Sequence, residues 1–264
     1  MSTINVDFVD PQSGSDVVVN NVTIKSVAPS GTYSNLHIGT SGSLLPNPSG
    51  TSNTTLGYQA GSALTSGVGN VIVGSSSSIA LNTGSFNTMI GNGAGTTITT
   101  GTSNTFIGSS TPFVIGSITG TNNIAIGQSA PLSSNTVSNE IVLGNGGTGV
   151  FRCAVTSITS LSDARDKTNV EESDYGIDFV NSLKPVKFEW DTRDGAKKGV
   201  KDLGFIAQDL KELDDEHLNL VYDENPDKLE ATYGRLIPVL VKAIQEMSSE
   251  IKSLKEEILI LKTK

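Results

Sequence analysis

NTMIG, residues 87–91, is one copy of a short pattern that recurs through the first half of the chain. Each copy places an asparagine three residues before an aliphatic residue and glycine. The glycines of successive copies lie 18, 17, 17, 17, 19 and 17 residues apart, which is too regular for a linker and typical of a repeat architecture. The copies open at Asn35, Asn53, Asn70, Asn87, Asn104 and Asn123, and a variant copy, NEIVLG, opens at Asn139.

Each copy predicts one strand and part of a coil. The residue before the glycine is always aliphatic, and the residue two positions earlier is aliphatic or β-branched. Because alternate residues of a strand share a face, we expect both positions to point inward. A small residue or glycine lies three positions after the glycine. Seven positions after it, five of the seven copies have an apolar residue, namely Leu64, Leu81, Ile98, Ile115 and Phe151.

A single repeat of this length cannot bury a core. Coils stacked about 4.8 Å apart would align the same positions into continuous columns, so we predict that residues 33–161 form a parallel β-solenoid or a trimeric, intertwined β-prism fibre. The asparagines would form a ladder or bond to the backbone in turns rather than bind a ligand. Residues 1–32 precede the regular repeats, and we expect an attachment or capping segment there.

Charge divides the chain into two modules. Residues 1–161 hold two basic and four acidic side chains, whereas residues 162–264 hold 16 Lys or Arg and 23 Asp or Glu. The net charge is −9 and no basic patch is visible, which argues against a nucleic-acid partner. The sequence MSTINVDFVD lacks the features of a secretory signal, and no apolar stretch reaches about 18 residues, so we expect no membrane insertion.

A heptad pattern occupies residues 233–264 and predicts a parallel coiled coil. Isoleucine fills every a position, and leucine or methionine fills every d position. This core favours a coiled coil of two helices, whereas a fibre favours three. Pro238 would lie in the first helical turn, where its missing N–H costs little. The a and d positions are Ile237, Leu240, Ile244, Met247, Ile251, Leu254, Ile258 and Leu261.

Between the repeats and the coiled coil, the pattern is mixed. YGIDFVNSLKPVKFEW, from residue 175, predicts a short helix that ends before Pro185 and then a strand through Phe188 and Trp190. GFIAQDLKEL, from residue 204, predicts a strand that runs into a helix. Cys153 would be a buried small hydrophobic residue.

Four segments in this half carry a family resemblance: LSDARDK at 161–167, LKPVKFEW at 183–190, GFIAQDL at 204–210 and YGRLIPVLVKAIQEM at 233–247. Together, and in this order, they resemble the C-terminal intramolecular chaperone domain of endosialidase tailspikes and related fibres, the S74 peptidases. The repeats resemble the heads of trimeric autotransporter adhesins and the shafts of viral tail fibres. The resemblance implies an α+β chaperone domain over residues 162–264, C-terminal to a mainly β fibre.

In that family, the domain trimerises, templates folding of the fibre and releases itself by means of a serine–lysine pair. The resemblance therefore assigns Ser162 as the nucleophile, Lys167 as the base and Leu161–Ser162 as the scissile bond. Residues five apart do not share a helical face, so the pair needs a turn or a lysine from a neighbouring subunit. The candidate supporting groups are Asp163, Arg165, Gln208 and Asp209.

The chemistry of such a pair sets a further requirement. Lysine accepts a proton only when it is neutral, and an unperturbed lysine has a pKa of about 10.4. The fold must therefore desolvate the amine or place a cation such as Arg165 beside it, whereas nearby Asp163 or Asp166 would act in the opposite direction.

The sequence thus predicts a homotrimeric viral fibre or spike with a self-cleaving chaperone that acts once on its own chain. We expect it in the virion after assembly in the host cytoplasm, with its own copies, virion attachment proteins and a host surface receptor as partners. The alternative is a non-cleaving structural or adhesive trimer that retains the domain as a clamp. A membrane-released or nuclear regulator would need a transmembrane or basic segment. His37 and His217 lack companion ligands, and no cofactor motif is present, so we predict neither metal nor cofactor.

Overall fold

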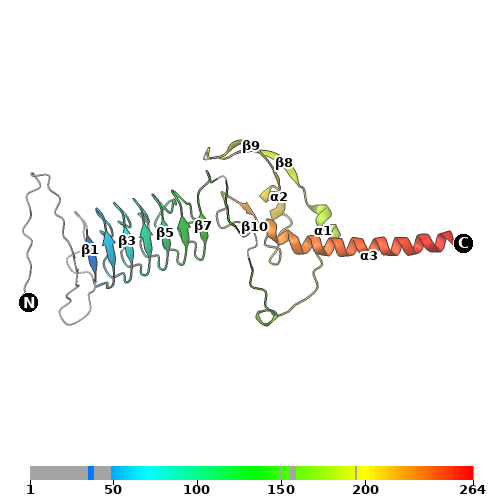
Figure 1. The fold of residues 1–264 in the computed structure, drawn as a ribbon, viewed down its shortest axis with the longest axis horizontal. Coiled ribbons are helices and arrows are strands. Elements are labelled where there is room, and N and C mark those ends of the chain that lie inside the picture. The colour runs from blue at the N-terminus through cyan, green and yellow to red at the C-terminus, as the bar shows by residue number, and fades with distance from the viewer. Residues whose placement is uncertain (1–34, 39–48, 149, 155–158, 194, 264) are drawn as a thin grey trace, which may run out of the picture.

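The computed structural model describes residues 35–38, 49–148, 150–154, 159–193 and 195–263. A β-solenoid is followed by a small mixed domain and a long helix (Figure 1). Seven parallel strands pair in sequence order, which confirms the predicted solenoid; the expected segment over residues 1–32 lies outside the described residues. The strands are β1 (Leu36–Ile38), β2 (Thr54–Leu56), β3 (Val71–Val73), β4 (Thr88–Ile90), β5 (Thr105–Ile107), β6 (Ile124–Ile126) and β7 (Ile141–Leu143).

The strands face the opposite way from the prediction. The middle residues Ile72, Met89 and Phe106 are fully buried, whereas Ile90, which precedes a glycine, is 39% exposed. The first and third residues of each strand do share a face, but that face points outward. An alternating pattern is symmetric between the two faces of a strand, so periodicity alone did not identify which face is buried.

The second apolar position behaves as predicted only in the regular coils. Leu64, Leu81 and Ile98 are fully buried, but Ile115 is 93% exposed, and Phe151 is also exposed. The coil that contains Ile115 is two residues longer than the regular ones. The buried position is taken there by Ile118, which forms a parallel bridge to Ile98.

A ladder of buried asparagines links the coils. The Oδ1 atom of Asn70 accepts hydrogen bonds from the backbone N and the Nδ2 of Asn87, both at 3.0 Å. The Nδ2 of Asn70 in turn donates to the carbonyl oxygen of Gly84 at 2.9 Å. Each side chain thus pairs with the next coil and with its own coil, which satisfies polar groups inside the solenoid. The ladder predicted from the repeat is confirmed at Asn53, Asn70, Asn87 and Asn104.

The last coil departs from the ladder. Glu140, rather than Asn139, occupies the equivalent position, because its backbone N donates to Asn123 Oδ1 at 2.9 Å and Ile141 pairs with Ile124. The variant copy thus has a glutamate where the other copies have an asparagine. Its strand, Ile141–Leu143, keeps the predicted register.

The glycine at the end of each strand is fixed by the closeness of neighbouring coils. Gly91 has a φ of +139°, and a Cβ atom there would lie 2.4 Å from the carbonyl oxygen of Gly108. A side chain is excluded both by the backbone conformation and by the next coil.

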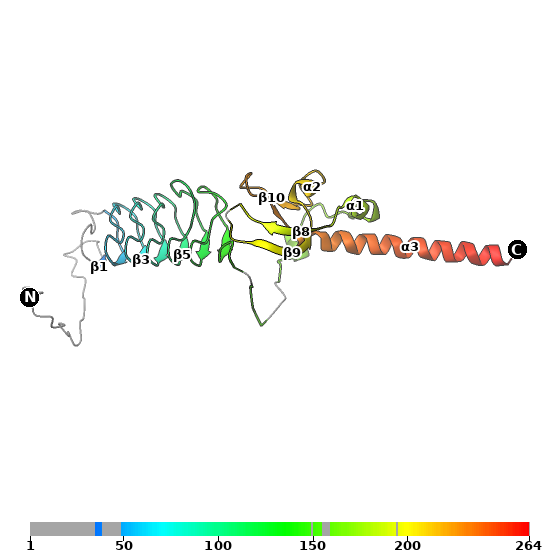
Figure 2. The same ribbon diagram turned by 90° about the horizontal axis from the view of Figure 1, so that it is seen from above.

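The C-terminal module is a small α+β domain that leads into a long helix (Figures 1 and 2). The helix before Pro185, the strand through Phe188 and Trp190 and the helix after Ile206 are present, as the sequence predicted. The strand expected over GFI ends at its first residue, Gly204. The β8–β9 hairpin and the β10–β11 hairpin are separate two-stranded antiparallel sheets. The elements are α1 (Ile177–Ser182), β8 (Val186–Asp191), β9 (Lys198–Gly204), α2 (Ala207–Lys211), β10 (Val221–Tyr222), β11 (Glu230–Ala231), η3 (Tyr233–Arg235) and α3 (Leu236–Lys262).

The base of α3 closes the core of this domain. Leu236 and Val239 pack with Leu210, Leu218 and Leu220, and α1 lies against the same helix. Pro238 lies in the first turn of α3, as expected. Contacts with α1 extend along the helix to Glu246, whose Oε2 accepts a hydrogen bond from the backbone N of Ile177 at 2.8 Å. The heptad positions of α3 are exposed in the single chain. No helix in the described part of the chain is both long and apolar enough to cross a membrane.

Replacing a ladder asparagine should destabilise the solenoid. Asn87→Ala leaves the buried backbone N–H of Asn104 and the carbonyl oxygen of Gly101 without partners. We expect the free energy of unfolding to fall by at least about 2 kcal/mol, since each unpaired buried group costs roughly 1–3 kcal/mol. Guanidinium unfolding followed by circular dichroism measures the change.

The control is Asn92→Ala, which removes an exposed asparagine side chain five residues away. A similar shift in unfolding midpoint for both variants would contradict the role assigned to the ladder.

Candidate functional site

A short turn shapes the segment that leads from the solenoid to α1. Residues 164–166 form the 3-10 helix η2 (Ala164–Asp166). The side chain of Asp163 caps this turn by accepting a hydrogen bond from the backbone N of Arg165 at 2.9 Å. The backbone N of Lys167 donates to the carbonyl oxygen of Ala164 at 3.3 Å, so the chain bends back within a few residues.

This turn brings together the two residues that the sequence nominated. The Nζ of Lys167 lies 2.6 Å from Ser162 Oγ and 3.3 Å from the carbonyl oxygen of Ser162. The turn thus bridges the five-residue spacing within the single chain. The preceding residue, Leu161, is fully exposed, so the peptide bond between Leu161 and Ser162 lies at the surface next to the pair.

The neighbouring charges pair with each other. Arg165 donates to the carboxylate of Asp163 from Nε at 3.0 Å and from Nη2 at 2.6 Å. The Arg165 side chain and then its backbone N–H hold the pKa of the Asp163 carboxyl below its usual value, and the same contact raises the pKa of Arg165. The Asp163 carboxylate is therefore engaged by Arg165 rather than by Lys167.

Gln208 and Asp209 lie elsewhere in the single chain. Both belong to α2, and Figure 1 places α2 and the loop between β7 and α1 on opposite sides of the start of α3. Gln208 is exposed, and Asp209 lines a small cleft with Ser182 and Lys184. The fold thus does not bring these two candidate supporting groups to Ser162 within one copy.

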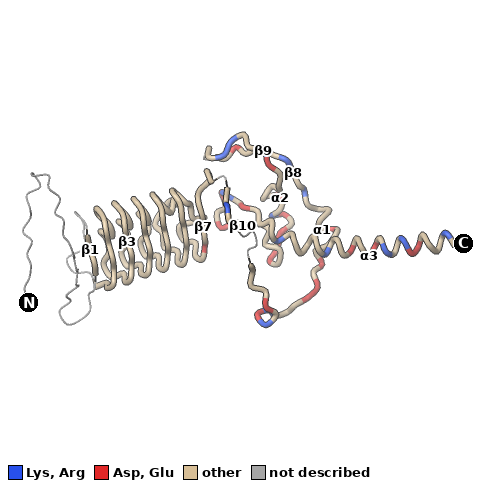
Figure 3. The backbone as a smooth tube through the Cα atoms, in the orientation of Figure 1, with Lys and Arg blue, Asp and Glu red and all other residues tan. Residues whose placement is uncertain are grey.

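The pair has the atoms for proton transfer but an open environment. A serine hydroxyl becomes a nucleophile when a neutral amine removes its proton, and an amine is neutral at ordinary pH only where water is excluded or cations lie close. All residues from 161 to 170 are exposed in the single chain. Charged side chains are concentrated in this C-terminal module, whereas the solenoid is nearly free of them (Figure 3).

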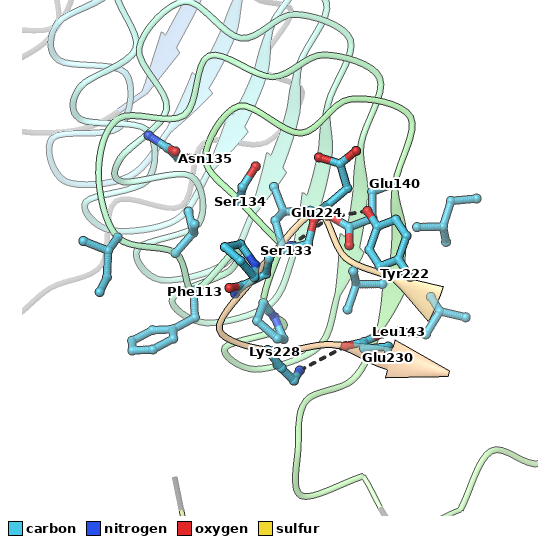
Figure 4. A pocket seen from close by; sticks show the side chains of 18 residues that line it. Phe113, Ser133, Ser134, Asn135, Glu140, Leu143, Tyr222, Glu224, Lys228 and Glu230 are labelled. Atoms are coloured by element: carbon cyan, nitrogen blue, oxygen red, sulfur yellow. Dashed lines mark hydrogen bonds and ion pairs between the residues drawn. The ribbon is translucent and has the colours of Figure 1, made fainter. Parts of the chain in front are cut away.

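A cleft of about 580 Å³ lies where the last coils of the solenoid meet the β10–β11 hairpin (Figure 4). Ser133 links the two sides: its backbone N donates to Glu140 Oε2 at 3.0 Å, and its hydroxyl lies 3.2 Å from that of Tyr222. Partial burial raises the pKa of Tyr222. Sequence reasoning did not find this contact, because it joins residues 89 positions apart and neither lies in a repeating pattern.

The remaining nominated residues take structural roles or lie at the surface. His37 in β1 forms a hydrogen bond through Nδ1 with Thr55. Across the residues that the structure describes, no three His, Cys, Asp or Glu side chains are grouped to hold a metal ion. Cys153 is exposed rather than buried, because it lies in the segment after the last coil and outside both cores.

The Asp163–Arg165 contact predicts a pH response of the turn. Because the pKa of the Asp163 carboxyl is lowered from 3.8, the cap persists as the pH falls to that usual value and weakens only below it. Arg165→Gln should raise the pKa of Asp163 toward its usual value. Carbon-13 NMR of the Asp163 carboxyl measures its titration in the Ser162→Ala chain and in the same chain with Arg165→Gln. Identical titration curves in these two chains would contradict the assignment.

Residues 162–219 match a family model described as the chaperone of endosialidase, Peptidase S74. No curated protein and no solved structure matches the chain. The match begins at Ser162, the residue that lies against the Lys167 amine, and lies C-terminal to β7, which ends at Leu143. The segment from residue 162 to 219 is therefore a domain of the endosialidase-chaperone family, and in this chain it follows a β-solenoid.

Proposed function

We propose that this chain is a homotrimeric fibre protein whose C-terminal domain templates assembly of the β-solenoid and then cuts itself off between Leu161 and Ser162. The observation that carries the proposal is the 2.6 Å contact between Lys167 Nζ and Ser162 Oγ at the first residue of the family match. The exposed peptide bond beside this contact supports it.

The proposed reaction uses only residues of this turn. The Lys167 amine accepts the hydroxyl proton as Ser162 Oγ adds to the carbonyl carbon of Leu161. The same proton passes to the Ser162 nitrogen as the C–N bond breaks, which leaves an ester between Leu161 and Ser162 Oγ. Water then hydrolyses the ester, so that one water molecule is consumed and two chains result.

Exposure of the pair gives assembly a role in this reaction. The amine must lose water or gain a cationic neighbour before it can act as a base, and the single chain supplies no cover over residues 161–170. Association of copies would supply that cover. Cleavage would then follow assembly, so that the template is not lost before the fibre has formed.

The architecture of the solenoid supports the template role. Each coil contacts only its neighbours, so a first ordered coil is needed before the others can stack on it. The β10–β11 hairpin holds the last coil through Tyr222 and Ser133, and α3 presents a heptad row that would gather copies. Folding would then spread from β7 toward β1.

The biological setting is part of the proposal. A fibre with this chaperone domain suits a virion, with attachment proteins at one end and a host surface receptor along or beyond the repeats. The solenoid, which is nearly free of charged residues (Figure 3), would serve as the shaft.

Self-cleavage is tested by intact mass and a denaturing gel. The freshly expressed chain should split into residues 1–161 and 162–264, and both Ser162→Ala and Lys167→Ala should lower the extent of cleavage at least about 100-fold, in line with the loss of a nucleophile or base. Matched controls are Ser160→Ala and Lys187→Ala, which remove an exposed serine and an exposed lysine outside the pair.

An uncut native chain would leave the domain as a retained clamp and reject the proteolytic role. Cleavage that persists in Lys167→Ala would reject the lysine as the base. The masses of the fragments also report which bond breaks, so a cut elsewhere would reject the Leu161–Ser162 assignment.

The template role has its own test. After denaturation, the uncut Ser162→Ala chain should regain its assembled state, whereas the released fragment 1–161 should not, because its template is gone. Light scattering and circular dichroism after dilution from guanidinium measure the recovery. Equal recovery of both would contradict templating.

A further inference from the structure

One face of the solenoid is largely apolar, and no described helix or strand outside the solenoid packs against it. Its last strand, β7, lines the cleft next to the β10–β11 hairpin. The first and third residues of each strand point outward, and none of them is charged. The third position is exposed in most coils, with Ile90 and Ile126 each at 39%. This outward strand face consists of Leu36, Ile38, Thr54, Leu56, Val71, Val73, Thr88, Ile90, Thr105, Ile107, Ile124, Ile126, Ile141 and Leu143.

The repeat is stricter at the third, outward strand position than at the buried middle position. The third strand position is Ile, Leu or Val in every coil, whereas the buried middle position varies from Ala125 to Phe106 and includes the polar Thr55. A side chain open to water has no reason to be aliphatic seven times in succession, and apolar surface of this extent marks a contact site. The outward face therefore has a packing requirement that the single chain does not meet.

The occupant must match the face coil by coil. Equivalent side chains recur at the spacing of stacked strands, about 4.8 Å, over the whole row. A second copy of this chain carries the same row at the same spacing, and two uncharged faces do not repel each other. A partner without this repeat would fit one or two coils and leave the others exposed.

The long helix points to the same occupant. The exposed heptad positions of α3 form a second apolar row, and a helix with such a row is buried by another copy of itself. In both views the column of strands and α3 lie along one line (Figures 1 and 2). Copies arranged around an axis beside that line would bury both rows at once.

We propose that the outward strand face of β1–β7 is the surface on which copies of this chain pack, in parallel and coil against equivalent coil. The inference rests on the self-association in the proposed function and specifies the contact; it does not require cleavage. In this arrangement the strand face lies inside the assembly and the turns lie outside.

The test uses single cysteines in the uncut full chain, with Ser162→Ala and Cys153→Ser as the background. Ile90→Cys and Ile126→Cys each place a thiol on the outward strand face. Ile79→Cys is the matched control, because Ile79 lies in the turn after β3 and its exposed fraction of 38% equals that of Ile90 to within a point. A short bismaleimide is added at low protein concentration, and the products are separated on a denaturing gel.

We expect most of the chain to appear as linked copies for residues 90 and 126 and at least about fivefold less linkage for residue 79. Linkage that is equal at all three positions, or confined to residue 79, overturns the proposal. An assembly seen by light scattering without linkage at residues 90 and 126 overturns it as well, because another face must then hold the copies together.

Two further measurements separate this inference from the proposed function. Ile90→Lys buries a charge in the proposed contact and should weaken assembly, whereas Ile79→Lys should not. If the Ile90→Cys variant is linked and a chain with Ser162 intact is not cleaved, the proteolytic role is rejected and the interface is retained. If the native chain is cleaved but remains monomeric, the interface is rejected and the proteolytic role is retained.

Discussion

Buried asparagines give each coil of the solenoid its register on the next. One side chain, such as Asn70, accepts from the backbone and amide of the following coil and donates to a carbonyl within its own coil. An amide that lost these partners inside the solenoid would cost more than its hydrogen bonds contribute, so the spacing of about 17 residues is strongly constrained. The three-residue strands, the glycines between closely stacked coils and the narrow apolar core all depend on this register.

The last coil of the solenoid differs from the regular coils. Glu140 ends the asparagine ladder, and its side chain accepts from Ser133, which also contacts Tyr222 of the following domain. The last coil thus differs in sequence from the others at the position where the chaperone domain touches it.

The candidate cleavage site lies in a turn between the two modules, and its residues belong to the core of neither. Asp163 and Arg165 neutralise each other and hold the turn, which leaves the Lys167 amine to contact Ser162. The pair was nominated from the sequence because a motif carries it, and the 3-10 turn was one of the two geometries that its spacing allowed. The outlying positions of Gln208 and Asp209 could not be foreseen, because the path of the chain around α3 is set by packing of α1, α2 and the β10–β11 hairpin.

The sequence by itself determined the repeat, the parallel strands, the change of composition near residue 162 and the long C-terminal helix. It offered the asparagine ladder as one of two roles for the repeated asparagine. These follow from local periodicity and from charge, which any stretch of chain carries with it. Only the tertiary structure decided which face of each strand is buried, that Ile118 replaces Ile115 in the longer coil, and that Tyr222 meets Ser133. Alternation along a strand is the same on both faces, and contacts between distant residues depend on how the coil closes, so neither is encoded in a local pattern.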